Sequence, residues 1–557
     1  MSIDNADIVK RVEYLVNERK GSVEQVWELI ERFVLPLRGK FYIDQNNEHE
    51  IDWHRRSIYD STAVFACQAL AASIHGNLTS PAQTWFEYLF KDNKMNEDDE
   101  IKEWLDEVTS LVYAALGESN FDIEIAEAYL ELVAYGTATL TEELDEKTGK
   151  LMFSAMPIKE VYFEEDYNKQ VARLYRVLRW TPMQIISKFG KDGTPQRVLD
   201  LAKTPAGSTD RLDVVFAIFP REGKEDADIG KPLAVKERPV GYTYILRDTK
   251  ETLGEEGGYY EMPAFVARWR KTPGSRWGHS PATVALSDIL MLNQLKEATL
   301  EAAAKAIDPA NIAEESALLG DIDLDRGGLT VVNDINGLKP YESGSRFDVS
   351  NMEIGMITES IRKAFYADQL ELKESPQMTA TEVNVRYELM QRLLGPTFGR
   401  LKTDLLDPIV ERAFNILYRA GKLPQLPEGL EEANIDVNYT GPLARSQKFE
   451  EAQAIQNYMM TTAQLAEAYP EALDIIDVDG AMSTMAILQG VPAKALKGKA
   501  EIKEMREQRK QQQEAAMQTQ QAQEAGAAMQ SVGQGAQAMG EAPPEMMQAI
   551  GQAAGGQ

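Results

Sequence analysis

The chain has 557 residues, with 59 Lys or Arg against 88 Asp or Glu and a formal net charge of -29. A chain of this length forms several packed regions rather than one core. Its acidity argues against tight, sequence-independent DNA binding, which requires many Lys and Arg contacts to phosphates. Such a charge allows a surface past which DNA slides, and it serves solubility equally well.

Four helical segments are predicted in the first quarter of the chain. Apolar residues recur at helical spacing over 9–35, with a break expected at Gly21-Ser22. A further helix is predicted over 57–76. Two more are expected over 100–116 and 122–135, the last one ended by Gly136.

The stretch from Ala63 to Ile74 is the longest weakly polar run, and it is too short to cross a bilayer. The single cysteine, Cys67, lies within it and permits no intrachain disulfide. We expect a buried, inert thiol rather than a nucleophile there. The first residues lack a basic segment followed by an apolar one, so no secretory signal and no membrane contact are expected.

The pattern changes to strands between about residues 138 and 270. Runs rich in β-branched and aromatic residues at 137–141, 171–177 and 214–219 favour strands, with Gly and Asp turns between them. An antiparallel sheet with a helix inserted near Pro182–Phe189 is predicted. Together with the helices this predicts an α+β fold that is mainly helical.

Two long helices follow, separated by a polar segment. Ser280-Pro281 is a good N-cap and first-turn pair, and Asp308-Pro309 ends the helix after Ile307. A capping box beginning at Ser350 predicts the second helix, to about 371. The segment 308–349 between them is rich in Gly and Asp.

Three alternate carboxylates in that segment, Asp321, Asp323 and Asp325, suggest a calcium loop. The EF-hand spacing fails, because Arg326 stands where the sixth-position glycine belongs and Val332 replaces the twelfth-position glutamate. We therefore expect a polar turn without metal.

The chain after residue 372 is again mainly helical. Pro376 interrupts the second long helix, and Thr379 to Glu382 form a fresh capping box. That helix is expected to be interrupted at Gly395-Pro396, kinked at Asp407-Pro408 and ended at Gly421. A small helical region is predicted over 446–496, followed by a basic stretch and a Gln/Ala/Met/Gly-rich tail whose low complexity is typical of disorder or of a helix packed against identical copies.

Motifs for enzymatic chemistry are missing from the sequence. None of the seven Gly-Lys pairs is followed by Ser or Thr, which excludes the P-loop pattern. His49-Glu50 lacks the second zinc-binding histidine, because Trp53 occupies its position, and no Gly-x-Ser-x-Gly elbow occurs. The sequence predicts no catalytic residues, no metal site and no cofactor.

Short strings in a fixed order resemble the head-to-tail connector (portal) family of podoviruses. They extend over most of the chain as far as residue 444. The strings are Ile58–Thr62, Leu70–Pro81, Trp85-Phe86, Ser119–Phe121, Leu132–Thr137, Arg268-Trp269, Gly278–Pro281, Met378–Val383 and Tyr439–Ala444. Beyond about residue 500 the chain matches only in composition.

This resemblance implies a homododecameric ring at the capsid vertex of a virion, assembled in the host cytoplasm. Its regions are called wing, stem, clip, tunnel loop and crown. In this chain they correspond to 1–280 with 381–440 (wing), 281–307 and 350–371 (stem), 308–349 (clip), 372–380 (tunnel loop) and 441–500 (crown), with a helical and low-complexity tail over 501–557.

The same resemblance implies partners and site residues. The clip would dock the terminase large subunit and later the tail adaptor or nozzle proteins, and the ring would contact the major capsid protein, the scaffolding protein and passing double-stranded DNA. The expected clip contacts are Asp321, Asp323, Asp325 and Arg326. The expected DNA-facing residues of the tunnel loop are Lys373, Glu374, Ser375, Gln377 and Met378.

Some of these residues have simpler interpretations. Thr379 and Glu382 are better explained as a helix cap than as DNA ligands, and a solvated loop explains Lys373 and Gln377 equally well. Trp85-Phe86 and Arg268-Trp269 are expected to pack inside the wing rather than to bind a partner.

Two alternative functions are weighed against the portal. A DNA-processing enzyme of a phage is disfavoured by the missing motifs and the acidic charge. An internal virion scaffold without a pore would suit the Gln/Ala/Met-rich tail.

Overall fold

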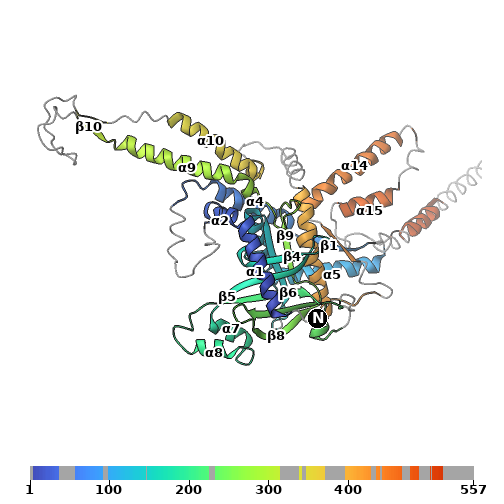
Figure 1. Cartoon of the computed structure of the whole chain (residues 1–557). Helices are drawn as coiled ribbons and strands as arrows, with labels where there is room; N and C mark the ends of the chain where they lie inside the picture. The colour runs from blue at the N-terminus through green and yellow to red at the C-terminus, as the bar shows by residue number, and fades with distance from the viewer. Residues whose placement is uncertain are drawn as a thin grey trace, which may run out of the picture.

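The computed structural model describes residues 4–36, 57–91, 98–145, 147–224, 232–313, 338–340, 347–370, 395–427, 435–439, 442–466, 469, 477–488, 502 and 505–517. Within these residues the fold is α+β and mainly helical, as expected (Figure 1). A single large hydrophobic core joins helices and sheets from the whole body. None of the described helices combines the length and apolar content needed to cross a membrane.

The chain begins with two helices, α1 (Asn5–Ser22) and α2 (Glu24–Phe33), separated at the predicted break. Helix α1 lays its apolar stripe, which includes Ile8 and Val12, on one face of a sheet and forms a second, smaller core there. Arg19 at the end of α1 is 1% exposed and donates to the carbonyl oxygens of Ile158 and Val161, each at 2.9 Å.

The next helices are α4 (Thr62–Leu78), α5 (Asp99–Gly117) and α6 (Phe121–Tyr135). The last two confirm the prediction to within about a turn. Helix α4 starts later than the predicted residue 57: residues 57–61 are not helical, and Ser57 and Tyr59 are hydrogen-bonded to a neighbouring helix instead. Cys67 in α4 is fully buried, as expected.

Two antiparallel sheets lie at the centre of the body. The three-stranded sheet has the order β3-β2-β9 and the five-stranded sheet the order β4-β5-β6-β7-β8. Helix α7 (Pro182–Phe189) is inserted between β5 and β6, as predicted, and is followed by α8 (Gln196–Ala202). The strands are β2 (Thr137–Leu144), β3 (Leu151–Met156), β4 (Val161–Glu165), β5 (Val171–Trp180), β6 (Leu212–Pro220), β7 (Val240–Leu246), β8 (Thr252–Tyr259) and β9 (Ala264–Arg268).

A two-stranded sheet joins distant parts of the chain. Strand β1 (Phe86–Phe90) pairs antiparallel with β12 (Ile435–Tyr439). Trp85 and Phe86 are buried beside it, and Trp85 stacks on Tyr439 with ring centroids 6.2 Å apart. Arg268 and Trp269 are likewise buried. Both Trp85-Phe86 and Arg268-Trp269 therefore pack inside the protein, as expected.

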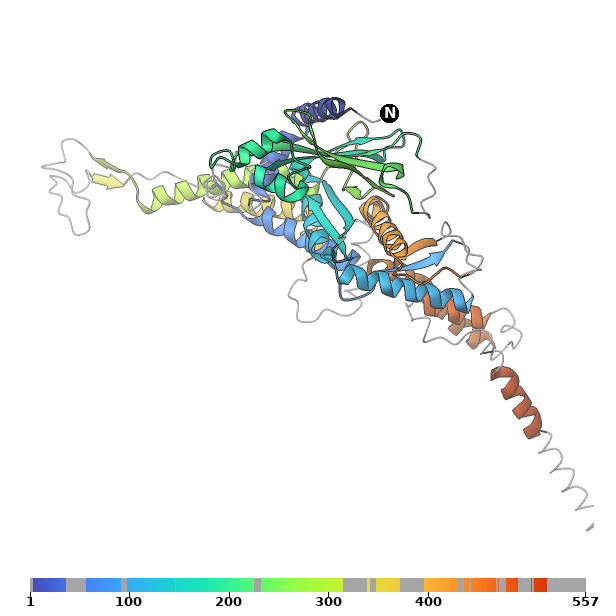
Figure 2. The ribbon, with the colours of Figure 1, turned by 90° about the horizontal axis from the view of Figure 1, so that it is seen from below.

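Helices α9 (Pro281–Ile307) and α10 (Phe347–Ala364) pack against each other and form an arm that projects from the body (Figures 1 and 2). Helix α9 has the predicted bounds. The prediction of one continuous second helix over 350–371 was wrong: α10 begins at Phe347, and Tyr366 adopts a left-handed φ of 57° before the short α11 (Ala367–Leu370). At the far end of the arm β10 (Asn311–Ala313) pairs with β11 (Leu338–Pro340), inside the Gly- and Asp-rich segment 308–349.

The helices after residue 395 first pack on the body, and those after residue 442 project from it. Residues 395–401 are helical and continue through a π-helical segment, Lys402–Leu406, into α13 (Asp407–Arg419), so the disturbance expected at Asp407-Pro408 lies just before it. Helices α14 (Pro442–Ala466) and α15 (Val478–Leu488) follow, and residues 505–517 of the tail are helical. The arm and the α14/α15 pair leave the body on different sides (Figures 1 and 2).

A buried carboxyl group lies where α13 covers β2. Glu142 is 0% exposed, and neither of its carboxyl oxygens has a hydrogen-bond partner in the described part of the chain. Arg412 of α13 donates instead to the main-chain oxygen of Glu142 (3.2 Å) and to the carboxylate of Glu261 (3.0 Å). Burial raises the pKa of Glu142 to about 8, with attraction to Arg412 opposing the shift and the charge of Glu261 adding to it.

We predict that Glu142 makes the fold less stable as the pH rises. The native carboxyl keeps its proton up to about pH 8, whereas an unfolded glutamate loses it near 4.5, so the free energy of unfolding falls across this interval. Glu142→Gln, which never ionises, should remove a fall of about 1.4 kcal/mol per pH unit. Urea unfolding at constant ionic strength measures it.

The matched control is Glu255→Gln, which removes one carboxylate at an exposed position of β8 and leaves the core unchanged. This control should keep the pH dependence of the parent chain. An unchanged slope in Glu142→Gln would show that the carboxyl is ionised in the native state.

Candidate functional site at the base of the arm

The site residues expected from the resemblance lie outside the described residues. This holds for Asp321, Asp323, Asp325 and Arg326 of the clip, for Lys373, Glu374, Ser375, Gln377 and Met378 of the tunnel loop, and for the capping residues Thr379 and Glu382. The described structure instead shows the contacts that hold the base of the arm formed by α9 and α10.

The first turn of α9 is fixed to the corner between α6 and β2. Ser280 caps α9 by accepting a hydrogen bond from the Thr283 amide (2.9 Å), and its hydroxyl donates to the carbonyl oxygen of Ala134 (2.6 Å). Gly278 donates to the Thr137 hydroxyl at 2.9 Å. These contacts join the two strings Leu132–Thr137 and Gly278–Pro281, which are more than a hundred residues apart in the sequence.

Two glycines allow the backbones to cross at this corner. Gly136 has a left-handed φ of 81°, and a Cβ atom there would lie 2.6 Å from the carbonyl oxygen of Gly278. A Cβ on Gly278 would lie 2.0 Å from the oxygen of Gly136. Both distances are below van der Waals contact, so this crossing requires glycine on both sides.

Aromatic side chains close the corner from the side of α2. Trp27 is 2% exposed and donates its indole N–H to the carbonyl oxygen of Tyr135 at 3.1 Å. Its ring meets Trp277 edge to face, with centroids 5.1 Å apart, and Trp277 in turn meets Phe163 at 4.8 Å. The start of α9 is thus packed against α2, the α6–β2 corner and β4.

Farther along α9, Asn293 holds the segment that precedes α4. It is 7% exposed, accepts a hydrogen bond from the Tyr59 amide (2.8 Å) and donates to the carbonyl oxygen of Ser57 (3.0 Å). The Tyr59 hydroxyl donates to Glu297 at 2.9 Å, which raises the pKa of Tyr59. These bonds use the backbone groups of residues 57–59 and explain why α4 begins only at Thr62.

Apolar side chains remain exposed on the arm. On α9 they are Val284 (70% exposed), Met291 (56%), Leu300 (56%) and Ile307 (85%). Met352 and Met356 of α10 are exposed to 70% and 59%. Exposed apolar residues grouped on one projecting element are typical of a surface that is covered by another chain.

A metal centre has no support in the described part of the chain. Within it, no group of three or more His, Cys, Asp or Glu side chains is arranged to hold a metal ion. Reasoning from the sequence alone missed the role of Gly136, Gly278 and Asn293. The strings that contain the glycines stand out in the sequence, but their contact with each other depends on the tertiary structure.

We predict that Gly136→Ala destabilises the chain strongly. The substitution places a methyl group on the Gly278 carbonyl and also incurs the left-handed backbone penalty, so the free energy of unfolding should fall by about 3 kcal/mol or more. Urea unfolding followed by tryptophan fluorescence measures the change.

Gly421→Ala is the matched control, because Gly421 follows the end of α13 with a φ of 66° but has nothing within 4 Å of the added Cβ. It should lose only the backbone contribution, about 1 kcal/mol. Equal losses in the two variants would mean that the crossing at the base of the arm relaxes without cost.

Comparison with known proteins shows the family to which the chain belongs. A family model described as bacteriophage head to tail connecting protein matches residues 5–496. The "Probable portal protein" of Bordetella phage BPP-1 is 28% identical over 495 residues, which cover 87% of each chain. The "Portal protein" of Salmonella phage epsilon15 is 25% identical over 560 residues, which cover 98% of each. With the family match extending over most of its length, the chain belongs to the bacteriophage head-to-tail connecting protein family.

Proposed function

We propose that this chain is the subunit of a phage portal, a ring at the capsid vertex through which double-stranded DNA is packaged and ejected. The family match over residues 5–496 and the names of both relatives support this function. Members of this family are structural parts of the virion rather than enzymes, in keeping with a sequence that lacks a P-loop.

The observation that carries the proposal is the projecting arm. Helix α9 has 27 residues, which corresponds to about 40 Å. Its base is held by glycine crossing, helix cap and aromatic packing, whereas its outer part presents apolar side chains. A rigid rod with an uncovered apolar surface is suited to side-by-side packing with copies of itself around a common axis.

The positions of these apolar residues favour a ring. Val284 and Met291 are seven residues apart and share one face of α9, as do Leu300 and Ile307. Leu300 follows Val284 by 16 residues, which corresponds to a rotation of about 160°. Each arm therefore has apolar residues on two nearly opposite sides, as a head-to-tail ring requires, because each copy uses different surfaces toward its two neighbours.

We assign the remaining regions by their order along the chain. Residues 1–280 with 381–440 form the wing, and the pairing of β1 with β12 supports the union of these two parts. The stem comprises 281–307 and 350–371, the clip 308–349, the tunnel loop 372–380 and the crown 441–500, followed by the tail 501–557.

We assign the partner contacts by the same reasoning. The clip, with Asp321, Asp323, Asp325 and Arg326, docks the terminase large subunit and then the tail adaptor. The tunnel loop, with Lys373, Glu374, Ser375, Gln377 and Met378, faces passing DNA. The wing contacts the major capsid and scaffolding proteins while the particle assembles in the host cytoplasm. The net charge of -29 favours a channel to which a polyanion does not adhere.

We predict that the purified chain forms dodecameric rings with a central hole and that Val284→Asn with Met291→Gln prevents their formation. Both side chains are exposed in the single chain, so the double variant should keep the circular dichroism and melting temperature of the parent. Native mass spectrometry and negative-stain microscopy measure assembly.

Ile123→Asn with Met183→Gln is the matched control, since these apolar residues of the body are 68% and 58% exposed. This control should assemble normally. A parent chain that stays monomeric, with no rings in capsid extracts, would refute the portal and favour a scaffold without a pore. Rings formed by the arm variant would show that the interface lies elsewhere.

A further inference from the structure

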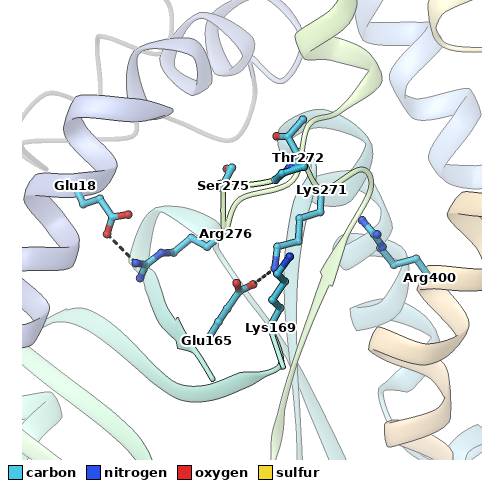
Figure 3. Close-up of a pocket in the computed structure, with 10 residues that line it drawn as sticks. Glu18, Glu165, Lys169, Lys271, Thr272, Ser275, Arg276 and Arg400 are labelled. Atoms are coloured by element: carbon cyan, nitrogen blue, oxygen red, sulfur yellow. Dashed lines mark hydrogen bonds and ion pairs between the residues drawn. The ribbon is translucent and has the colours of Figure 1, made fainter. Parts of the chain in front are cut away.

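A pocket with an excess of positive charge lies beside the base of the arm (Figure 3). It has a volume of about 370 Å³. Its walls come from the end of α1, the turn between β4 and β5, the loop 271–276 between β9 and α9, and the helical residues 395–401. Its charged lining residues are Glu18, Glu165, Lys169, Lys271, Arg276 and Arg400.

The carboxylates of this pocket already have cationic partners within the chain. Glu18 pairs with Arg276 at 3.0 Å. Glu165 pairs with Lys271 at 2.5 Å and also with the buried Arg268. These ion pairs connect the loop 271–276 to α1 and to β4. Both carboxylates of the pocket therefore already have a cationic partner.

Two cations of the lining remain without such a partner. Within the described residues, neither Lys169 nor Arg400 makes a side-chain hydrogen bond or an ion pair. Lys169 is exposed in the β4–β5 turn, and Arg400 is half-buried on the opposite wall. Asp404 attracts Arg400 electrostatically, but the ion pair that it makes is with Arg268, at 3.4 Å. The pocket thus offers two available positive charges that face one small volume (Figure 3).

The small volume of the pocket favours a single carboxylate over a nucleic acid as its occupant. A DNA backbone carries a charge about every 1.7 Å along the duplex and requires an extended basic surface. This pocket has a volume of only about 370 Å³ and its lining is drawn from a few side chains, so it cannot follow a run of phosphates. A single acidic side chain of a protein fits both the volume and the two cations.

The composition of the chain indicates which protein supplies that side chain. Each copy carries 88 Asp and Glu against 59 Lys and Arg, so neighbouring copies in a ring repel one another at long range. Contacts in a ring are heterologous, so a basic site on one copy meets a different surface of the next. Charge complementarity therefore points to a second copy of this chain.

We propose that Lys169 and Arg400 form a docking site for an acidic side chain of the adjacent copy in the assembled ring. The inference rests on the proposed portal function. It gives the loop 271–276, which leads directly into α9, two roles, because this loop then both supports the base of the arm and lies at the interface with the neighbour. The contact is electrostatic, so it weakens as salt concentration rises.

Carbodiimide crosslinking tests the contact directly, because it couples a lysine amine to a carboxylate only when the two are in contact. Rings are assembled from a mixture of unlabelled and isotope-labelled chains, and crosslinked peptides are identified by mass spectrometry. The expected product joins Lys169 to an Asp or Glu of another copy, in rings and not in monomers. Products that join Lys169 only to its own chain would overturn the proposal.

Charge reversal provides the second test. Lys169→Glu with Arg400→Glu should raise the chain concentration needed for half-assembly about tenfold, and the melting temperature of the subunit reports any loss of the fold itself. The matched control is Lys191→Glu with Arg211→Glu, which changes the net charge equally at two exposed residues outside the pocket. If both double variants weaken assembly equally, a general charge effect replaces the docking site.

Two further results complete the test. If the charge-reversed chain misfolds, Lys169→Gln with Arg400→Gln removes the charges more gently and should still weaken assembly. Normal rings from the pocket variants overturn the docking site alone. A parent chain that forms no rings under any condition overturns the portal function, so the two failures are distinguishable.

Discussion

The position of the arm depends on the place where the backbones at Gly136 and Gly278 cross. The absence of both side chains lets the α6–β2 corner touch the loop that leads into α9, and Ser280 then fixes the first helical turn to Ala134. Since α9 is about 40 Å long, a rotation of about 10° at its base would move its tip by about 7 Å. A closed ring tolerates little of this, because every copy must repeat the same angle. The crossing thus connects a local steric requirement to the geometry of the whole assembly.

Buried arginines organise the body around this corner. Arg19 donates to carbonyl oxygens around β4, Arg268 pairs with Glu165, and Arg412 joins α13 to Glu261. A planar guanidinium with several donors satisfies such carbonyl and carboxylate groups at once, which a lysine cannot do. With many of its cations held in such internal contacts, the chain leaves an acidic exterior. The net charge suits a channel for DNA, and within the described residues Lys169 and Arg400 of the pocket have no such internal ion pair.

Features set by neighbouring residues were predictable from the sequence. The helix Pro281–Ile307 was predicted with its observed bounds, because Ser280-Pro281 and Asp308-Pro309 are strong local start and stop signals. The end of α6 at Gly136 and the inserted helix Pro182–Phe189 followed for the same reason. The lack of enzymatic motifs and the ordered strings pointed to the family that the comparison then showed.

Features set by distant contacts were decided only by the tertiary structure. The pairing of Phe86–Phe90 with Ile435–Tyr439 has no local signal, since either strand alone is compatible with many partners. A helix was predicted to start at residue 57, but Asn293 binds the Tyr59 amide and the Ser57 carbonyl oxygen, and these residues are not helical. The sequence by itself thus determined the helix Pro281–Ile307 with its cap, the inserted helix Pro182–Phe189, the end of α6 and the family. The tertiary structure decided that Gly136 meets Gly278 and that Glu142 is buried without a partner among the described residues, because such contacts depend on which surfaces the packed core brings together.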